Sequence, residues 1–125
     1  PDWRLNVGYL SWQSQRVNLA ATVCSGRGDF KGNVHEETKW QINNSGYSMF
    51  GEITFFDGDW ALMGRYDTFD ARVTSDDTIH RRAIAGIARR LVGRSRILID
   101  HERNVDESWD SQADHVTQLT VEFRY

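Results

Sequence analysis

Arginine and carboxylate side chains recur at alternate positions in several segments, a pattern that suits contact with charged solutes. A guanidinium presents a rigid fork of donors that matches phosphate and carboxylate groups. Alternatively, the arginines pair with acids such as Glu102 and Glu122 and brace the structure that carries them. Both roles are compatible, since paired charges still set up a field that orients dipolar solutes. The candidates are Arg4, Arg16, Glu52, Arg65, Asp67, Arg82, Arg90, Arg96, Asp100, Glu102 and Arg124.

Other chemistries have weaker support in the sequence. The four histidines lack the spacing typical of metal ligands. His101 and His115 can meet across a hairpin, with Glu102 and Asp114 alongside, but polar residues near a loop explain them more simply. The Arg-Gly-Asp of segment 25–29 lacks the Gly-Lys-Ser/Thr of a phosphate loop and fits an external loop better. We therefore expect no catalytic residue, enzymatic activity, metal or cofactor.

Composition fits a single folded domain spanning residues 1–125. The chain is 39% hydrophobic and 26% charged, which excludes a disordered tail. A net charge of −3 argues against a nucleic-acid partner, which favours basic proteins. Cys24 is the single cysteine and has no disulfide partner within the chain. The sequence leaves its role open.

Most of the chain alternates between apolar and polar residues with a period of two, which predicts β-strands. We group Leu5, Val7 and Tyr9 on the apolar face of the first strand, and Arg4 on its polar face. The predicted strands lie in segments 3–12, 16–24, 46–56, 59–67, 96–102 and 115–125.

Segment 81–92 is ambiguous. Ile84, Ile87, Ala88 and Leu91 also fit the spacing of a helix. As a strand, the segment leaves Arg89 on the apolar face, near a short turn where its side chain can extend to a polar layer. We favour the strand because its neighbours are strands.

The predicted connections alternate in length. Short ones are expected at 14–15, 57–59 and 93–95, and long polar ones at about 25–40, 68–79 and 103–114. This alternation is typical of an up-and-down antiparallel meander. In outer-membrane barrels the short turns lie on the periplasmic side.

The two faces of the predicted strands favour a transmembrane barrel. No apolar run reaches the roughly 18 residues of a membrane helix, but a membrane strand needs only about 9–11 residues with one apolar face. Aromatic residues gather near strand ends, where lipid–water boundaries favour them. They are Trp3, Tyr9, Tyr47, Phe55, Trp60, Tyr66, Phe123 and Tyr125. Seven strands are an odd number and open edges are costly in lipid, so we expect the C-terminal part of a larger barrel.

Three motifs resemble a known family: GRYDTFD at 64–70, the stretch from Ile84 to Glu102, and the closing VEFRY. They are similar to the C-terminal third of Gram-negative outer-membrane porins, and closest to the phosphate-selective porin O and P family. The resemblance covers about residues 46–125, with a weaker echo in 2–24. Arg89 and His101 stand where the family pattern favours Tyr.

The resemblance implies an outer-membrane channel for ion transport, through which small hydrophilic solutes, anions among them, diffuse. The expected partners are outer-membrane lipid, the assembly machinery that recognises a terminal aromatic strand, and the solutes. The sequence does not decide whether the chain forms a homo-oligomer. Two alternatives remain. One is a porin-like sheath or scaffold around a partner protein, and the other is a soluble lipocalin-like barrel that turns its apolar face inward around a ligand.

Overall fold

The computed structural model describes residues 4–27, 43–73, 76–93, 95–107 and 112–123. All regular structure in these residues is β-strand. The seven strands are β1 (Arg4–Gln13), β2 (Val17–Arg27), β3 (Asn43–Phe55), β4 (Trp60–Val73), β5 (Asp76–Arg90), β6 (Arg96–Glu107) and β7 (Ala113–Glu122).

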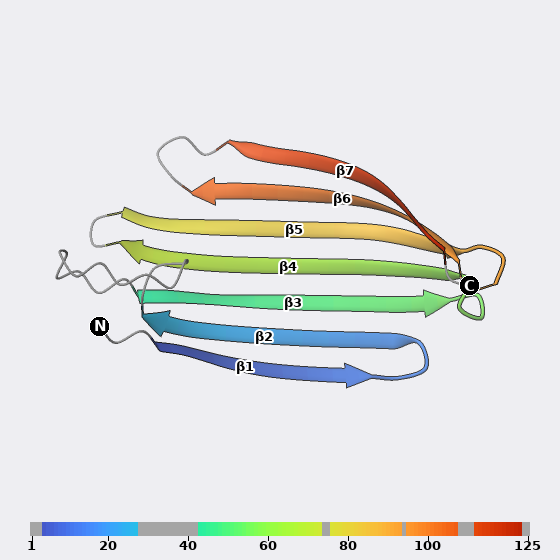
Figure 1. Cartoon of the computed structure of the whole chain (residues 1–125), viewed down its shortest axis with the longest axis horizontal. Helices are drawn as coiled ribbons and strands as arrows, with labels where there is room; N and C mark the ends of the chain where they lie inside the picture. The colour runs from blue at the N-terminus through green and yellow to red at the C-terminus, as the bar shows by residue number, and fades with distance from the viewer. Residues whose placement is uncertain (1–3, 28–42, 74–75, 94, 108–111, 124–125) are drawn as a thin grey trace.

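The strands form one antiparallel meander in the order β1-β2-β3-β4-β5-β6-β7 (Figure 1). The predicted all-β fold is therefore confirmed. The sheet is open: in the described part of the chain, β1 pairs only with β2 and β7 only with β6. The described residues include no helix long and apolar enough to cross a membrane.

The predicted short turns lie at one end of the sheet, together with the end of β7 (Figure 1). In the first turn, the Ser14 hydroxyl accepts a hydrogen bond from the Val17 amide at 3.1 Å. In the second turn, Asp57 and Gly58 adopt positive φ angles of 54° and 88°. Asp tolerates this region better than most residues and Gly adopts it without strain. The third turn uses Gly93 in the same way, with φ of 71°.

Two of the three predicted long connections are wrong in length. Strands β4 and β5 continue to Val73 and from Asp76, so most of segment 68–79 is paired strand. Likewise β6 runs to Glu107 and β7 begins at Ala113. Backbone pairing needs no apolar side chain, so polar residues extend a strand without changing its ladder. The polar composition of these segments therefore concealed their pairing. Most of segment 25–40 lies outside the described residues.

The helical alternative for 81–92 is wrong. Residues up to Arg90 belong to β5, which pairs with β4 from Trp60↔Arg89 to Val73↔Asp76 and with β6 on its other side. Neighbouring strands supply hydrogen-bond partners along the whole segment, and this tertiary pairing decides between two patterns that fit the same residues.

The register defines two faces of the sheet. Residues that stand opposite each other in an antiparallel pair share a face. We call one the apolar face; it carries Leu19, Met49, Leu62, Ile87 and Ile99 on β2 to β6. We call the other the charged face; it carries Glu52, Arg65, Asp67, Arg82, Asp100 and Glu102 on β3 to β6.

Burial does not follow the pattern of a water-soluble sheet. Among the described residues, Ala88 is the single buried hydrophobic side chain, at 5% exposure, and it lies on the charged face. Large residues of the apolar face are exposed, including Leu62 at 53% and Leu119 at 65%. The described residues form no dry core, and the apolar side chains have no cover within the described sheet.

The face assignment for the first strand is wrong. Gln13 stands opposite Asn18, and Gly8 opposite Val23. An even number of residues separates Gln13 from Asn18, so even-numbered residues of β1 share a face with odd-numbered residues of β2. Consequently Gly8, Leu10 and Trp12 join the apolar face, while Leu5, Val7 and Tyr9 join the charged face.

Candidate functional site: the charged face

The charged face carries a connected cluster at its centre. Arg65 donates from Nε to both carboxylate oxygens of Asp67, at 2.9 and 3.0 Å. Asp67 stands opposite Arg82 on β5. Arg82 Nη2 in turn donates to Glu102 Oε2 on β6 at 2.7 Å, and Asn104 Nδ2 donates to Glu102 Oε1 at 2.8 Å. Acids and bases therefore alternate across β4, β5 and β6.

Two further pairs extend this pattern along β5, β6 and β7. His80 Nδ1 contacts Asp106 Oδ1 nearer the end of the sheet that lies away from the short turns. At the short-turn end, Arg96 Nε donates to Glu122 Oε2 between β6 and β7. The expectation that acids and arginines brace each other therefore fits Arg65, Arg82 and Arg96. Each of these pairs retains access to solvent, with arginine side chains between 44% and 48% exposed.

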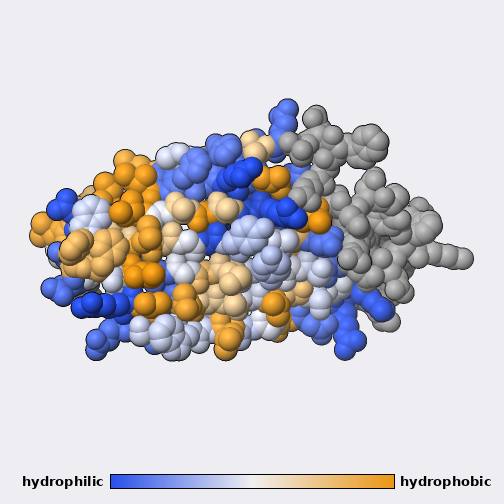
Figure 2. Space-filling model, turned by 180° about the vertical axis from the view of Figure 1, so that it is seen from behind, coloured by the Kyte–Doolittle hydropathy of each residue, from blue (hydrophilic) through white to orange (hydrophobic). Residues whose placement is uncertain are grey.

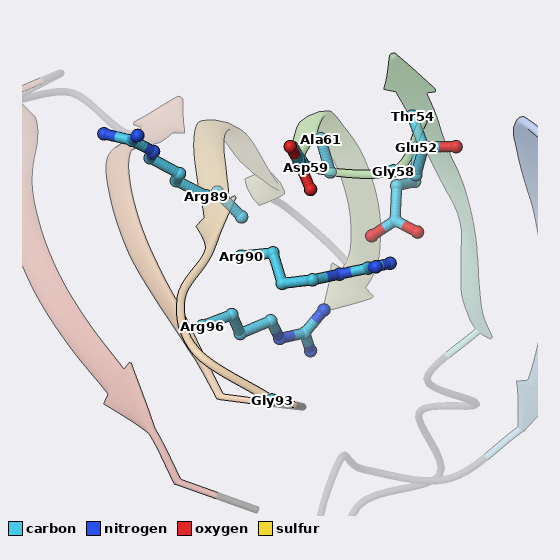
Figure 3. A pocket seen from close by; sticks show the side chains of 10 residues that line it. Glu52, Thr54, Gly58, Asp59, Ala61, Arg89, Arg90, Gly93 and Arg96 are labelled. Atoms are coloured by element: carbon cyan, nitrogen blue, oxygen red, sulfur yellow. The ribbon is translucent and has the colours of Figure 1, made fainter. Parts of the chain in front are cut away.

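A pocket of about 380 Å³ lies at the short-turn end and is lined by Glu52, Ala61, Ala88, Arg90 and Arg96, among others. Arg90 and Arg96 stand opposite each other in the register. Figure 3 shows their guanidinium groups and the Glu52 carboxylate pointing into the same space, while Arg89 points away from it. The curved strands thus enclose charged side chains. We call this space the turn-end pocket.

The turn-end pocket carries both signs of charge. Like charges directly opposite on a sheet repel each other. Arg96 has Glu122 as a partner, and Glu52 and Asp59 also line the pocket. Small side chains at Ala61 and Ala88 leave room beside the two arginines. The pocket is therefore a polar space in which acids balance the arginines.

Apolar side chains interrupt the charged face between these clusters. A second cavity of about 280 Å³ is lined by Phe50, Met63, Ile84, Asp100 and Glu102, among others. Sequence alternation places Phe50 and Met63 on this face, but it gives no reason to expect them beside Asp100. The charged face is therefore a mixed surface, wet at its ionic clusters and less polar between them.

The predicted charged residues divide by location. Glu52, Arg65, Asp67, Arg82, Asp100 and Glu102 share the charged face of β3 to β6. Arg90 and Arg96 share it at the short-turn end. The face predicted for Arg4 is wrong. Arg4 stands opposite Arg27 on the apolar face, which also carries Leu10 and Val23. Arg16 lies in the first turn, where its carbonyl accepts from the Thr54 amide at 2.7 Å. Arg124 lies outside the described residues.

Four of the predicted aromatic residues share the apolar face: Tyr47, Phe55, Trp60 and Tyr66. The rings of Tyr47 and Tyr66 approach to 6.1 Å between centroids. Tyr9 lies on the charged face, so its predicted face is wrong. Phe123 is 70% exposed, beyond the end of β7. Trp3 and Tyr125 lie outside the described residues.

Sequence reasoning missed Trp12. It lies on the apolar face near the short turns and is 56% exposed. Both faces of β1 carry apolar residues, so alternation alone could not decide which face Trp12 belongs to. Only the pairing of Gln13 with Asn18 decides it. A count of the residues in the first turn would have given the same answer.

His101 and His115 do meet, as the hairpin suggested. His101 Nε2 lies 3.2 Å from His115 Nδ1, and His101 Nδ1 lies 2.9 Å from Thr117 Oγ1. Glu102 and Asp114 point to the opposite face and do not join them. Within the described residues, no group of three or more His, Cys, Asp or Glu side chains is arranged to hold a metal ion.

Comparison with protein-family models, with curated proteins and with solved structures finds no match to this chain. Its function must therefore be argued from the two faces themselves.

Proposed function

We propose that this chain forms the C-terminal strands of a transmembrane β-barrel in the outer membrane of a Gram-negative bacterium. The barrel passes small hydrophilic solutes by diffusion, with anions favoured. The observation that carries the proposal is the inverted burial: apolar side chains face outward without cover, while charged side chains meet on the other face.

The exposed apolar side chains favour lipid as their surroundings. Ile99, Leu119 and Val121 are 51%, 65% and 43% exposed and lie next to one another across β6 and β7. Large contiguous apolar surfaces on soluble proteins mark contacts with partners or membranes. A lipocalin-like barrel would instead point these residues into its interior. Their exposure argues for hydrocarbon as their solvent.

On the side away from the short turns, the limit of the large apolar residues lies at different heights on β3 and β7, while Ile79 on β5 and Val105 on β6 lie beyond the line that joins them. On β3 it lies at Tyr47, whose register row runs through Thr68, Arg81 and Val105 to Ala113 on β7. On β7 the large apolar residues begin only at Leu119, which is 119 − 113 = 6 positions further along. At about 3.3 Å per residue, across four strand spacings of about 4.8 Å, this offset corresponds to a tilt of roughly 45°.

Such a tilt is what a membrane barrel requires. Its strands incline by about 35–45° to the membrane normal, so a flat membrane boundary meets successive strands at different residues. Strands of 13 to 15 residues in β3 to β5 also exceed the roughly 9–11 residues that a bilayer needs.

The free edges of β1 and β7 indicate that further strands complete the barrel. Unpaired backbone groups in hydrocarbon cost several kcal/mol each, so an open seven-stranded sheet is not a stable membrane structure. We infer that strands from a longer chain or a second chain pair with both edges.

In the proposed channel, water fills the space beside the charged face. Solutes move along a wall in which arginines hold the acidic side chains in place, so the electric field along the wall is fixed while the solute moves. Covalent chemistry is not part of this mechanism.

Accessibility of cysteine side chains tests the orientation of the faces. Cys24 is a half-buried free thiol on the charged face. In reconstituted vesicles, a charged, membrane-impermeant thiol reagent should modify Cys24. A cysteine at Leu19→Cys, in a Cys24→Ser background, lies on the apolar face and should react only with a lipid-soluble reagent. Reversed reactivity would overturn the proposal.

Conductance tests the transport function. Full-length protein in planar bilayers should conduct, and Glu102→Gln should shift selectivity toward anions, because it removes a negative charge beside Arg82. Deleting residues 123–125 should abolish assembly into the outer membrane. Folded protein that requires no detergent, or an undiminished yield after the deletion, would count against the barrel.

A sheath around a partner protein is the second candidate. The observation that favours it is the apolar strip of Leu5, Val7 and Tyr9, which β1 presents on the otherwise polar face. Such a strip suits contact with protein inside the barrel. A sheath whose lumen is occupied should not conduct until its partner is removed, whereas an open channel conducts at once.

A further inference from the structure

Over most of β5, β6 and β7 the charged residues of the apolar face are cationic, and the acidic register positions on this face, Asp77 and Glu107, lie at the strand ends away from the short turns. The register assigns its charged side chains, within the described stretches 79–90, 96–106 and 113–122, to Arg81, Arg89 and Arg103. Two histidines, His101 and His115, share this face. The acids of the same stretches all lie on the opposite face: Asp100, Glu102, Asp106, Asp114 and Glu122.

Four residues of this face form a small cluster on β6 and β7, which we call the cationic patch: His101, Arg103, His115 and Thr117. Thr117 stands opposite His101, and His115 stands opposite Arg103. The imidazole rings stack with 5.4 Å between centroids. The Thr117 hydroxyl lies 2.9 Å from His101 Nδ1 and holds the ring in place. The patch is therefore an ordered group of hydrogen-bonding side chains on a face that is otherwise apolar.

The patch directly follows the large apolar residues Ile99 and Leu119, and Val105 lies beyond it on β6. His101 and Thr117 are each two positions from Ile99 and Leu119, which stand opposite each other. Figure 2 shows hydrophobic side chains toward the short-turn end of this face and hydrophilic ones along its upper margin. The patch thus lies next to Ile99 and Leu119, on the side of these residues that is away from the short turns.

We propose that the cationic patch binds phosphate groups of membrane lipid headgroups. This inference rests on the proposed membrane orientation, which places the patch at the lipid–water boundary. An arginine fork binds a phosphate through two parallel hydrogen bonds. His115 Nε2, which lies outside the contacts among His101, His115 and Thr117, can add a further donor.

The surroundings favour an anion over a metal ion. Two facing imidazole nitrogens also suit a transition metal, but Arg103 stands opposite His115 and repels a cation. The nearest acids in sequence, Glu102 and Asp114, lie on the other face of the sheet. A phosphate therefore finds attraction from every charged neighbour in the patch, and a metal ion finds repulsion.

Lipid binding to the full-length protein in neutral detergent tests this inference. Phosphatidic acid, whose headgroup is a phosphate monoester, should bind more tightly than phosphatidylcholine in native mass spectrometry. Arg103→Gln should weaken phosphatidic acid binding about fivefold, as expected for one arginine at a charged lipid surface. Arg65→Gln removes an arginine from the charged face and should leave lipid binding unchanged. Thr117→Val offers a milder variant, with a smaller loss, if Arg103→Gln does not fold.

Any one of four results would overturn the inference. Equal affinity for the two lipids, or equal losses in Arg103→Gln and Arg65→Gln, would show that the patch does not read phosphate. Full displacement of lipid by inorganic phosphate would indicate a site for a free anion. Zinc binding that is lost in His101→Gln would indicate a metal site. Conductance of the same variants is measured separately, so a failed lipid site is distinguishable from a failed channel.

Discussion

The two faces of the sheet share one backbone and one alternation of residues, but they differ in how their side chains are held. On the charged face, side chains bind each other: Arg82 to Glu102, and Arg96 to Glu122. On the apolar face, outside the cationic patch, the described contacts are looser, such as the 6.1 Å approach of the Tyr47 and Tyr66 ring centroids. The charged face completes its interactions within the chain, whereas the apolar face depends on surroundings that the chain does not supply.

This difference explains how a sheet without a core holds its shape. Backbone ladders on both sides of β2 to β6 fix the strands, and ionic contacts connect β5 to β6 and β6 to β7 across the charged face. A water-soluble protein of this length stabilises itself mainly by apolar burial. Here that contribution is missing from the described sheet, and in the barrel that we propose lipid would provide it.

The largest expected effect comes from a charge in the middle of the apolar face. Leu62→Arg places a cation where we propose hydrocarbon, and should cost about 2–4 kcal/mol of folding stability in a bilayer. Urea titration in lipid vesicles measures this cost. Gln118→Arg, on the charged face, is the matched control and should change stability by less than about 0.5 kcal/mol. Equal effects of the two variants would break the distinction between the faces.

Glycines on the two faces provide a comparison that does not depend on lipid. A Cβ at Gly46, on the charged face, would lie 2.7 Å from the Thr68 carbonyl oxygen, and backbone cannot move aside cheaply. We expect Gly46→Ala to lose about 1–3 kcal/mol through overpacking. At Gly64, on the apolar face, the nearest atom is 3.9 Å away. Gly64→Ala should gain about 0.5–1 kcal/mol, because alanine loses less entropy in a strand.

Thermal and urea unfolding of the two alanine variants, in one detergent, measures this difference. A gain in stability for Gly46→Ala would show that β2, β3 and β4 pack less closely than the structure indicates.

An intermediate effect is expected where a cation does lie on the apolar face. The Arg89 guanidinium lies 5.2 Å from the Trp60 ring centroid, at the short-turn end. Such a cation–π contact contributes about 0.5–1 kcal/mol at an exposed site. A double-mutant cycle of Arg89→Ala and Trp60→Phe should return a coupling energy in this range. Absence of coupling would mean that the Trp60 ring does not stabilise Arg89 at this position.

Much of the fold was predictable because period-two alternation is a local signal. It predicted the central part of all seven strands, including β5, and the positions of the three short turns. It failed at strand ends such as residues 68–73, where polar residues continue the ladder. Hydropathy reports which solvent a side chain meets and carries little information about where backbone pairing stops.

The candidate site was predictable to a lesser extent. The shared face of Arg82 and Glu102 follows from alternation, but their 2.7 Å contact depends on register, which a sequence without turn geometry leaves open. The same gap produced the wrong face for Arg4 and Tyr9. The sequence indicated that His101 and His115 can meet across a hairpin. Their position next to Ile99 and Leu119 on the apolar face follows only from the register of β6 and β7.

The smallest expected effect concerns the charged face itself. Arg65 and Asp67 form an ion pair with side chains 48% and 22% exposed. Pairs of this kind contribute about 0.2–1 kcal/mol because water screens them. Arg65→Gln should therefore barely change stability, and high salt should remove what difference there is, since it screens exposed charges. Unfolding titrations of both proteins at low and high salt measure this. A loss as large as that of Leu62→Arg would mean that the charged face is dry, and a dry charged face contradicts a water-filled path.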